Sequence, residues 1–230
     1  HFEDNVSCIP EPFRSPDTLV VYTPAVPSDH RELTFYRNQG NKILKRAELL
    51  GELTRRERAL CVAGTHGKTT TTTLIAHLLR QSTVDCHAFL GGISNNYQTN
   101  FLYSSHSDYA VIEADEFDRS FHHLSPYIAV VTSADPDHLD IYHTPEAYRE
   151  SFEHFTSLIS AEGALIMRQG IPITPRLQAG TRLYTYGLEG EGADFYASDV
   201  RVEEGRLFFT WYHPALGGLP AGELRVELGV

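Results

Sequence analysis

The sequence predicts an α/β fold in which a mostly parallel sheet is followed by an antiparallel β extension. Apolar runs alternate with amphipathic segments of helical period up to residue 160, as in parallel strands joined by helices. One apolar run ends in a glycine turn directly before a helix. After Gly163 only short β segments follow, separated by Gly, Pro and Asp.

Residues 1–58 predict part of a Rossmann-like domain. No opening strand with a glycine-rich turn precedes the alternating elements, so we expect this stretch to be the second half of that domain. After a loop over 1–16, we expect a strand at 18–26, a helix at 28–40, a short strand at 41–44 and a charged helix at 45–58.

Residues 59–230 predict a second domain that carries the main sheet. A hairpin is expected between Val200 and Trp211, around Glu203-Glu204-Gly205. Strands are expected at 59–64, 85–92, 107–115 and 126–135, helices at 69–81 and 145–160, and extension strands at 163–169, 181–187, 194–214 and 222–230.

Composition and charge exclude several classes of protein. The formal net charge is −11, from 19 Lys+Arg against 30 Asp+Glu, which argues against nucleic acid as the main partner. No apolar run is long enough to span a bilayer, and no secretion leader is recognisable. The 3 cysteines have no metal-ligand spacing and are expected to be reduced thiols of a cytoplasmic protein.

The segment "CVAGTHGKTTTTTLIAHLL" predicts a phosphate-binding loop between a strand and a helix. Backbone N–H groups of the loop and of the helix start can bind an anion, with Lys68 reaching the outer phosphates and the Thr69 hydroxyl holding Mg²⁺. The loop is shorter than the usual pattern, and the alternative is a plain glycine turn beside a surface lysine. Candidate nucleotide-binding residues are Gly64, Thr65, His66, Gly67, Lys68, Thr69 and Thr70.

Two further polar segments follow predicted strands. Glu113 comes directly after one apolar run and is the candidate metal ligand within "VIEADEFDRS"; its other acids are expected in a solvated turn. His138, in "SADPDHLDIYHT", is the candidate for a second metal. Since carboxyl ends of parallel strands share one edge of a sheet, we expect both residues beside Lys68, the three forming a catalytic group. The adjacent His122 and His123 are expected to be structural or exposed.

"GTHGKTTTT", "EADEFDRSFHHLSP" and "DPDHLD" together resemble the Mur ligases of peptidoglycan synthesis, over nearly the whole chain. The resemblance is strongest to members that join L-alanine to UDP-N-acetylmuramate. It implies an ATP-dependent ligase acting through an acyl phosphate, with two Mg²⁺ sites served by Thr69, Glu113 and His138. His66 and the segment after Gly92 would face the nucleotide sugar.

The resemblance also implies two domain roles. Residues 1–58 would belong to the UDP-substrate domain, and residues 59–230 to the central ATP-binding domain. Neither the family's adenine-binding His-Asn segment nor its amino-acid-binding domain is recognisable here, so we expect a part of a longer enzyme whose alanine site lies elsewhere and which is inactive alone.

Three alternatives remain open at this point. A recycling ligase that attaches a tripeptide to the same nucleotide sugar would have a similar ATP site. A generic phosphate-loop NTPase or kinase would not need the nucleotide sugar. A module that binds nucleotide without catalysis is the third.

Overall fold

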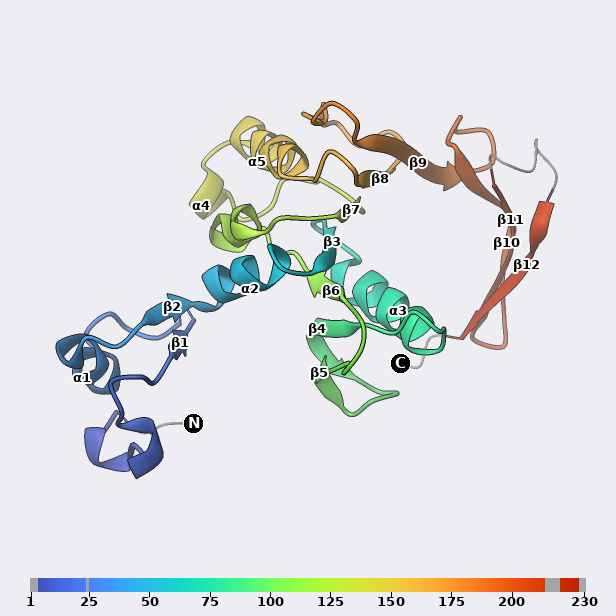
Figure 1. The fold of residues 1–230 in the computed structure, drawn as a ribbon. Helices are drawn as coiled ribbons and strands as arrows, with labels where there is room; N and C mark the ends of the chain where they lie inside the picture. The colour runs from blue at the N-terminus through green and yellow to red at the C-terminus, as the bar shows by residue number, and fades with distance from the viewer. Residues whose placement is uncertain (1–3, 24, 214–219, 228–230) are drawn as a thin grey trace. The chain divides into compact units, whose positions relative to one another are not determined.

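The computed structural model describes residues 4–23, 25–213 and 220–227 (Figure 1). The chain divides into two compact units, His1–Leu53 and Thr54–Val230. The division falls before residue 58, where the sequence suggested a boundary, and the roles of the two parts remain predictions. None of the helices in the described ranges is long and apolar enough to cross a membrane.

The first unit contains a small parallel pair of strands and two helices. Val20 pairs with Ile43 in the parallel register of β1 and β2. Helix α1 ends at Gly40, whose φ of 81° is a conformation that glycine adopts without steric cost. Pro24, inside the predicted strand at 18–26, lies outside the described residues. The elements are η1 (Val6–Cys8), η2 (Glu11–Phe13), β1 (Val20–Tyr22), α1 (Arg31–Gln39), β2 (Ile43–Lys45) and α2 (Arg46–Thr54), which extends one residue past this unit.

The second unit is built on one sheet of ten strands in the order β12-β11-β10-β9-β8-β7-β3-β6-β4-β5. Neighbours pair in parallel from β4 across to β10. The strands are β3 (Arg58–Ala63), β4 (His87–Ser94), β5 (Thr99–Leu102), β6 (Tyr109–Glu113), β7 (Ile128–Val131), β8 (Ala164–Arg168), β9 (Arg182–Leu188), β10 (Phe195–Glu203), β11 (Arg206–Tyr212) and β12 (Pro220–Glu227). The helices are α3 (Lys68–Arg80), η3 (Phe117–His123), α4 (Leu139–Tyr142) and α5 (Pro145–Ser157).

The antiparallel part of the sheet begins later than Gly163. Strands β8 and β9 continue the parallel sheet, and after Gly163 antiparallel pairing starts only between β10 and β11. At the opposite edge of the sheet, β5 pairs antiparallel with β4. Chain segment 169–181 joins β8 to β9 without a helix, so the sequence lacks the helical signal that normally marks a parallel crossover. The hairpin around Glu204-Gly205 is present, and β12 pairs antiparallel with β11. Pro214 and residues 228–230 of the predicted strands lie outside the described residues.

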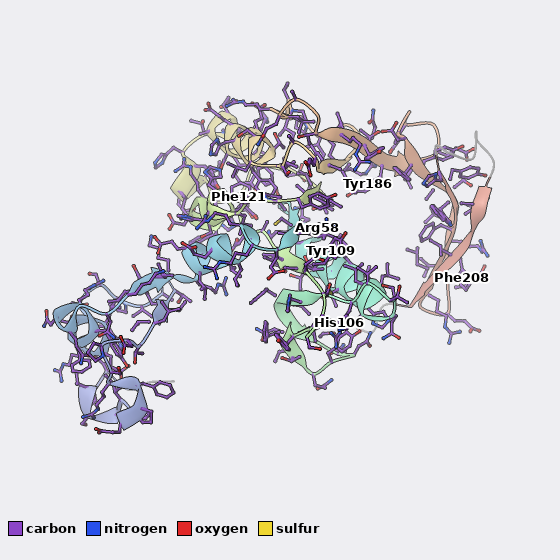
Figure 2. The ribbon with its side chains drawn as sticks, in the orientation of Figure 1. Arg58, His106, Tyr109, Phe121, Tyr186 and Phe208 are labelled. Carbon is purple, nitrogen blue, oxygen red and sulfur yellow. The ribbon has the colours of Figure 1, made fainter. Side chains whose placement is uncertain are left out.

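The core of this unit lies along the central strands β3, β6 and β7. Val62, Val111 and Val131 are fully inaccessible to solvent, which is expected for parallel strands covered on both faces. Helix α3 packs on β3, β4 and β6. Arg58, at the start of β3, lies beside Tyr109 at the start of β6, with its guanidinium carbon 5.7 Å from the ring centroid (Figure 2).

A second group of buried side chains is aromatic. It packs the segments that follow β6 and β7 against helix α5. Phe121 of η3, labelled in Figure 2, stacks on Phe155 of α5 with ring centroids 4.9 Å apart. Tyr142 of α4 packs edge-on against Tyr148, with ring centroids 4.8 Å apart. These rings are at most 1% exposed. Burial of such large side chains therefore holds η3 and α4 against α5.

Candidate functional site

Three neighbouring parallel strands bring the predicted site residues to one edge of the sheet. Strand β3 lies between β6 and β7, with Val62 opposite Glu113 and Ala63 opposite Val131. The turn 64–67, the segment after Glu113 and the segment after Val131 therefore leave the sheet side by side. Polar groups that follow such strands converge at the carboxyl edge.

The turn 64–67 is bound tightly to the segment after β7. Gly64 has a φ of +146°, and a β-carbon there would lie 2.0 Å from Thr132 Oγ1, so a larger residue is excluded on both grounds. The Thr132 hydroxyl lies 2.5 Å from the carbonyl oxygen of His66, and the His66 N–H donates to Ser133 Oγ at 2.9 Å. The backbone of the turn is thus fixed before any ligand binds, and the His66 N–H already has a partner within the protein.

Thr65 contacts the protein interior. Its hydroxyl donates to the carbonyl oxygen of Asp135 at 2.7 Å and lies 2.8 Å from the hydroxyl of Tyr148. Burial raises the pKa of the Tyr148 phenol above its ordinary value. Thr65, predicted as a nucleotide-binding residue, therefore also fastens the turn to α5.

Lys68 begins α3 and is held on two sides. Its Nζ donates to the Gly64 carbonyl oxygen at 2.7 Å and to Glu116 Oε1 at 2.9 Å, while Glu116 Oε2 lies 2.8 Å away. This second oxygen makes an ion-pair contact without hydrogen-bond alignment. The side chain of Lys68 is 15% exposed and that of Glu116 only 1%.

The start of α3 leaves donors and hydroxyl groups facing outward. The first internal bond of the helix runs from Thr71 N to the Gly67 carbonyl oxygen, so the N–H groups ahead of Thr71 have no partner within the helix. The Thr72 hydroxyl, in contrast, bonds back to the Lys68 carbonyl oxygen at 2.7 Å and is buried. The exposed members of the predicted set are His66, Gly67, Thr69 and Thr70.

Glu113 and Thr69 both lie against the pair Gly91-Gly92 of β4. Glu113 Oε2 accepts a hydrogen bond from the Gly91 N–H at 3.1 Å, and a β-carbon on Gly91 would lie 2.2 Å from that oxygen. A β-carbon on Gly92 would lie 3.7 Å from Thr69 Cγ2. Carboxylate and hydroxyl oxygens are the ligands that Mg²⁺ prefers, so this donor set suits that ion.

His138 lies at the start of α4 in a left-handed conformation, with a φ of 51°. Its N–H donates to Asp137 Oδ1 at 2.7 Å, and its ring packs edge-on against Phe117 at 5.3 Å. Phe117 directly follows Glu116, so the segments after β6 and β7 meet here. Within the described residues, no group of three or more His, Cys, Asp or Glu side chains could hold a metal ion together.

Glu116 is the site residue that sequence reasoning missed. We expected it in a solvated turn, but it is buried and contacts Lys68. The run Glu113, Asp115, Glu116, Asp118 offers no periodicity that selects the buried member. Tyr142, whose hydroxyl donates to the Glu116 carbonyl oxygen, was also missed. In both cases the deciding contact joins residues far apart in the chain.

The first unit has a pocket of its own, with a volume of about 560 Å³. Glu32 is 9% exposed, and its Oε1 has no hydrogen-bond partner among the described residues. The walls are otherwise largely apolar and include Ile9, Phe13, Val21 and Tyr36.

Comparisons with known proteins agree with this arrangement. The Mur ligase middle domain model matches residues 62–228. The chain belongs to the Mur ligase family, whose members are ATP-dependent ligases.

The chain is similar along its full length to a particular kind of Mur ligase. The UDP-N-acetylmuramate–L-alanine ligase of Porphyromonas gingivalis is 62% identical over 231 residues, which is 100% of this chain and 50% of that protein. The chain thus spans about half the length of the curated relatives it matches.

Solved structures show the same fold. The UDP-N-acetylmuramate–alanine ligase of Thermotoga maritima matches with a TM-score of 0.75 and 25% identity, covering 92% of this chain and 47% of that one. The UDP-N-acetylmuramate:L-alanyl-γ-D-glutamyl-meso-diaminopimelate ligase of Neisseria meningitides matches with a TM-score of 0.69 and 22% identity, covering 91% and 68%.

Proposed function

We propose that this chain contains the ATP-binding part of a cytoplasmic ligase that joins L-alanine to UDP-N-acetylmuramate in peptidoglycan synthesis. The observation that supports the proposal is that β3 pairs in parallel with both β6 and β7, so that Lys68, Glu113 and the His138 segment follow neighbouring carboxyl ends. Identity of 62% to a ligase with that name supports the choice of substrates.

The nucleotide phosphates would lie at the start of α3. The ammonium group of Lys68 and the N–H groups ahead of Thr71 supply positive charge and donors for a polyphosphate. This local field has to act against a net charge of −11 for the whole chain. Gly64, Thr65, His66 and Gly67 shape the turn, and Thr69 and Thr70 offer exposed hydroxyl groups.

Glu113 and Thr69 would hold one Mg²⁺, since a carboxylate oxygen of Glu113 and the side chain of Thr69 lie against the same pair of glycines. His138 is proposed at a second metal on the strength of the family resemblance, and its ring is 34% exposed. When bound, the metal would neutralise phosphate charge and polarise the phosphoryl group that is transferred. Thr69, Glu113 and His138 would orient it.

The proposed reaction has two steps. A muramoyl carboxylate oxygen attacks the γ-phosphorus of ATP, forming an acyl phosphate and releasing ADP. The amine of L-alanine then attacks the acyl carbon, forming the amide and releasing phosphate and a proton. The residues of this chain serve the first step, in which Lys68 offsets repulsion between the carboxylate and the polyphosphate.

The first unit is proposed as the second half of the UDP-substrate domain. Its parallel β1–β2 pair, α1 and the pocket beside Glu32 agree with half of a parallel-sheet domain. The segment after Gly92, beside Thr69, is proposed to face the nucleotide sugar, as is His66.

Two alternatives are separated by substrate. A tripeptide ligase shares this fold, as the Neisseria structure illustrates, but high identity to alanine ligases favours alanine. A generic NTPase or kinase would release phosphate without the nucleotide sugar. An assay of phosphate release by the full-length enzyme with and without UDP-N-acetylmuramate, and with alanine or the tripeptide, distinguishes all three.

The same assay tests Lys68. We expect Lys68→Ala to lower sugar- and alanine-dependent phosphate release by at least about 100-fold, because a single fixed positive donor contributes that much to such a transition state. Lys42→Ala, which changes a lysine outside the turn, is the matched control and should retain activity. Wild-type turnover by Lys68→Ala would refute the assignment.

A further inference from the structure

The ion pair between Lys68 and Glu116 is unusual because its acidic member is almost completely buried. Glu116 is 1% exposed, and both carboxylate oxygens lie within 2.9 Å of the ammonium nitrogen. A buried carboxylate is costly unless it is paired, so the surrounding structure fixes Glu116 in contact with Lys68. Lys68 in turn is held at a defined position by Glu116 and by the Gly64 carbonyl oxygen.

The backbone of Glu116 is fixed from α4. The Tyr142 hydroxyl donates to the Glu116 carbonyl oxygen, and Ser151 Oγ of α5 lies 3.4 Å from that hydroxyl. Tyr142 is 1% exposed. The Arg119 guanidinium carbon lies 5.0 Å from the centroid of the Tyr142 ring. Side chains of α5 and η3 therefore hold Tyr142 in contact with the peptide that carries Glu116.

The chain directly after Glu116 is strained. Asp118 and Arg119 are consecutive non-glycine residues with φ of 51° and 54°. Such conformations are unfavourable and persist only where the surroundings enforce them. The strained turn returns the chain so that Glu116 points at Lys68 while Phe121 enters the aromatic cluster around α5.

We propose that Glu116 is a positioning residue for Lys68, and that Tyr142 supports it from α4. The inference rests on the proposed function and assigns new roles within the same site. Glu116 sets the direction of the ammonium group, and its negative charge opposes the polyphosphate that Lys68 binds. The enzyme thus gains a fixed ammonium group and loses part of its attraction for ATP.

These two effects predict opposite changes when the charge of Glu116 is removed. Without the carboxylate, the ammonium group has no negatively charged partner in the free enzyme and keeps only the Gly64 carbonyl oxygen, whereas the phosphates of ATP supply negative charge, so ATP binding becomes tighter. Without the fixed direction, the ammonium group is displaced from the transferring phosphoryl group, and the transfer slows.

The test is Glu116→Gln in the full-length ligase. We expect the Kd for ATP, measured by calorimetric titration, to fall by at least about threefold, while kcat for sugar- and alanine-dependent phosphate release falls about 10- to 100-fold. A merely structural role would weaken both binding and turnover. Weaker ATP binding, or an unchanged kcat, in Glu116→Gln would overturn the inference.

Tyr142→Phe separates orientation from charge and remains decisive if Glu116→Gln does not fold. It keeps the carboxylate and removes the side-chain donor to the Glu116 carbonyl oxygen, which then keeps only the bond from the Arg119 N–H at 3.0 Å, so kcat should fall about tenfold with the Kd for ATP unchanged. An unchanged kcat in Tyr142→Phe would overturn the support from α4 and, where Glu116→Gln does not fold, the proposal as a whole.

The matched control is Glu153→Gln. Glu153 of α5 forms an ion pair with Arg176 at 3.0 Å and accepts a hydrogen bond from Thr174 N at 3.0 Å. Its carboxylate thus serves segment 169–181 and not the turn 64–67, so both Kd and kcat should be unchanged. Failure of the proposed function has a different signature. In that case the wild-type enzyme itself would show no dependence of phosphate release on the nucleotide sugar and alanine.

Discussion

Gly91 has no side chain because the carboxylate of Glu113 occupies the space where one would lie. A β-carbon there would lie 2.2 to 2.4 Å from the three terminal atoms of the Glu113 side chain. The terminal atoms of glutamate can move, so substitution of Gly91 would displace the carboxylate more than it would unfold the protein. The position of a proposed metal ligand is therefore set by a residue of the neighbouring strand.

We predict that Gly91→Ala lowers Mg²⁺-dependent phosphate release by the full-length enzyme at least about tenfold, because a ligand displaced by about 1 Å no longer meets the metal properly. Thermal unfolding should change little. Gly92→Ala is the control for this geometry, since its β-carbon meets only Thr69 Cγ2 at 3.7 Å and spares Glu113. Equal activity of Gly91→Ala and wild type would show that Glu113 is not required where the structure places it.

His122 is a residue whose burial links stability to pH. Its Nε2 lies 2.9 Å from Ser151 Oγ, and its ring stacks on Phe121 at 4.8 Å. Burial lowers the pKa of His122 from 6.5 to about 4, opposed in part by its hydrogen bond to the Ser151 backbone. The unfolded chain therefore binds a proton at a higher pH than the folded chain does.

We predict that the free energy of unfolding decreases as the pH falls from about 6.5 to about 4, since only the unfolded state gains this proton in that window. The upper limit for one proton is about 1.4 kcal/mol per pH unit, reduced by the partial exposure of the ring. Denaturant titrations give the free energy of unfolding at pH 7 and at pH 5. The decrease in this free energy between the two pH values should be smaller for His122→Asn than for wild type. His123→Asn, at the exposed neighbouring position, should show the same pH dependence of unfolding as wild type. If His122→Asn also shows it, His122 does not link stability to pH.

Local sequence predicts those candidate site residues whose role depends on their own chain neighbours. Gly64, Lys68 and Thr69 follow from a strand, a turn and a helix in succession, and Glu113 from its position at a strand end. Glu116 could not be separated from Asp115 and Asp118, because its burial depends on Lys68 and on Tyr142 from α4. The role of Thr65 in fastening the turn depends likewise on Tyr148 of α5.

At the scale of elements, length decided what could be predicted. Helices α3 and α5 span three turns or more and show clear apolar periodicity, and α5 also has the Thr144 cap followed by Pro145. The four-residue α4 and the short edge strand β5 are too brief to carry a period. Yet α4 carries Tyr142, whose hydroxyl donates to the Glu116 carbonyl oxygen. An element too short to be recognised in the sequence therefore helps to position the buried Glu116.

The parallel pairing of β8 and β9 also escaped prediction. Sequence analysis links parallel strands through the helix that joins them, and segment 169–181 has none. The segment is instead fastened to α5 by side chains, because Arg176 N donates to Thr156 Oγ1 at 2.8 Å and Thr174 N donates to Glu153 Oε1 at 3.0 Å. Such contacts substitute for a crossover helix and leave no periodic signal.

For the molecule as a whole, we assign different proposed functions to the two units. The second unit holds the turn 64–67, Glu113 and His138 within one sheet, and the first unit has its own strand pair and pocket. The residues proposed for phosphate and metal binding all belong to the second unit. Nucleotide binding and ligation can therefore be measured separately.

We predict that the purified 230 residues bind ATP with Mg²⁺ but do not join alanine to UDP-N-acetylmuramate. The relatives that carry out this ligation are about twice as long, and the proposed alanine site is not among the residues assigned here. Binding should be detectable by calorimetric titration and should be lost in Lys68→Ala but not in Lys42→Ala, because only Lys68 lies at the start of α3. Product formation should be absent by mass spectrometry at any alanine concentration, whereas the full-length enzyme in the same assay forms product. Ligation by the 230 residues alone would place the alanine site within this chain and would require a new assignment of its acceptor pocket.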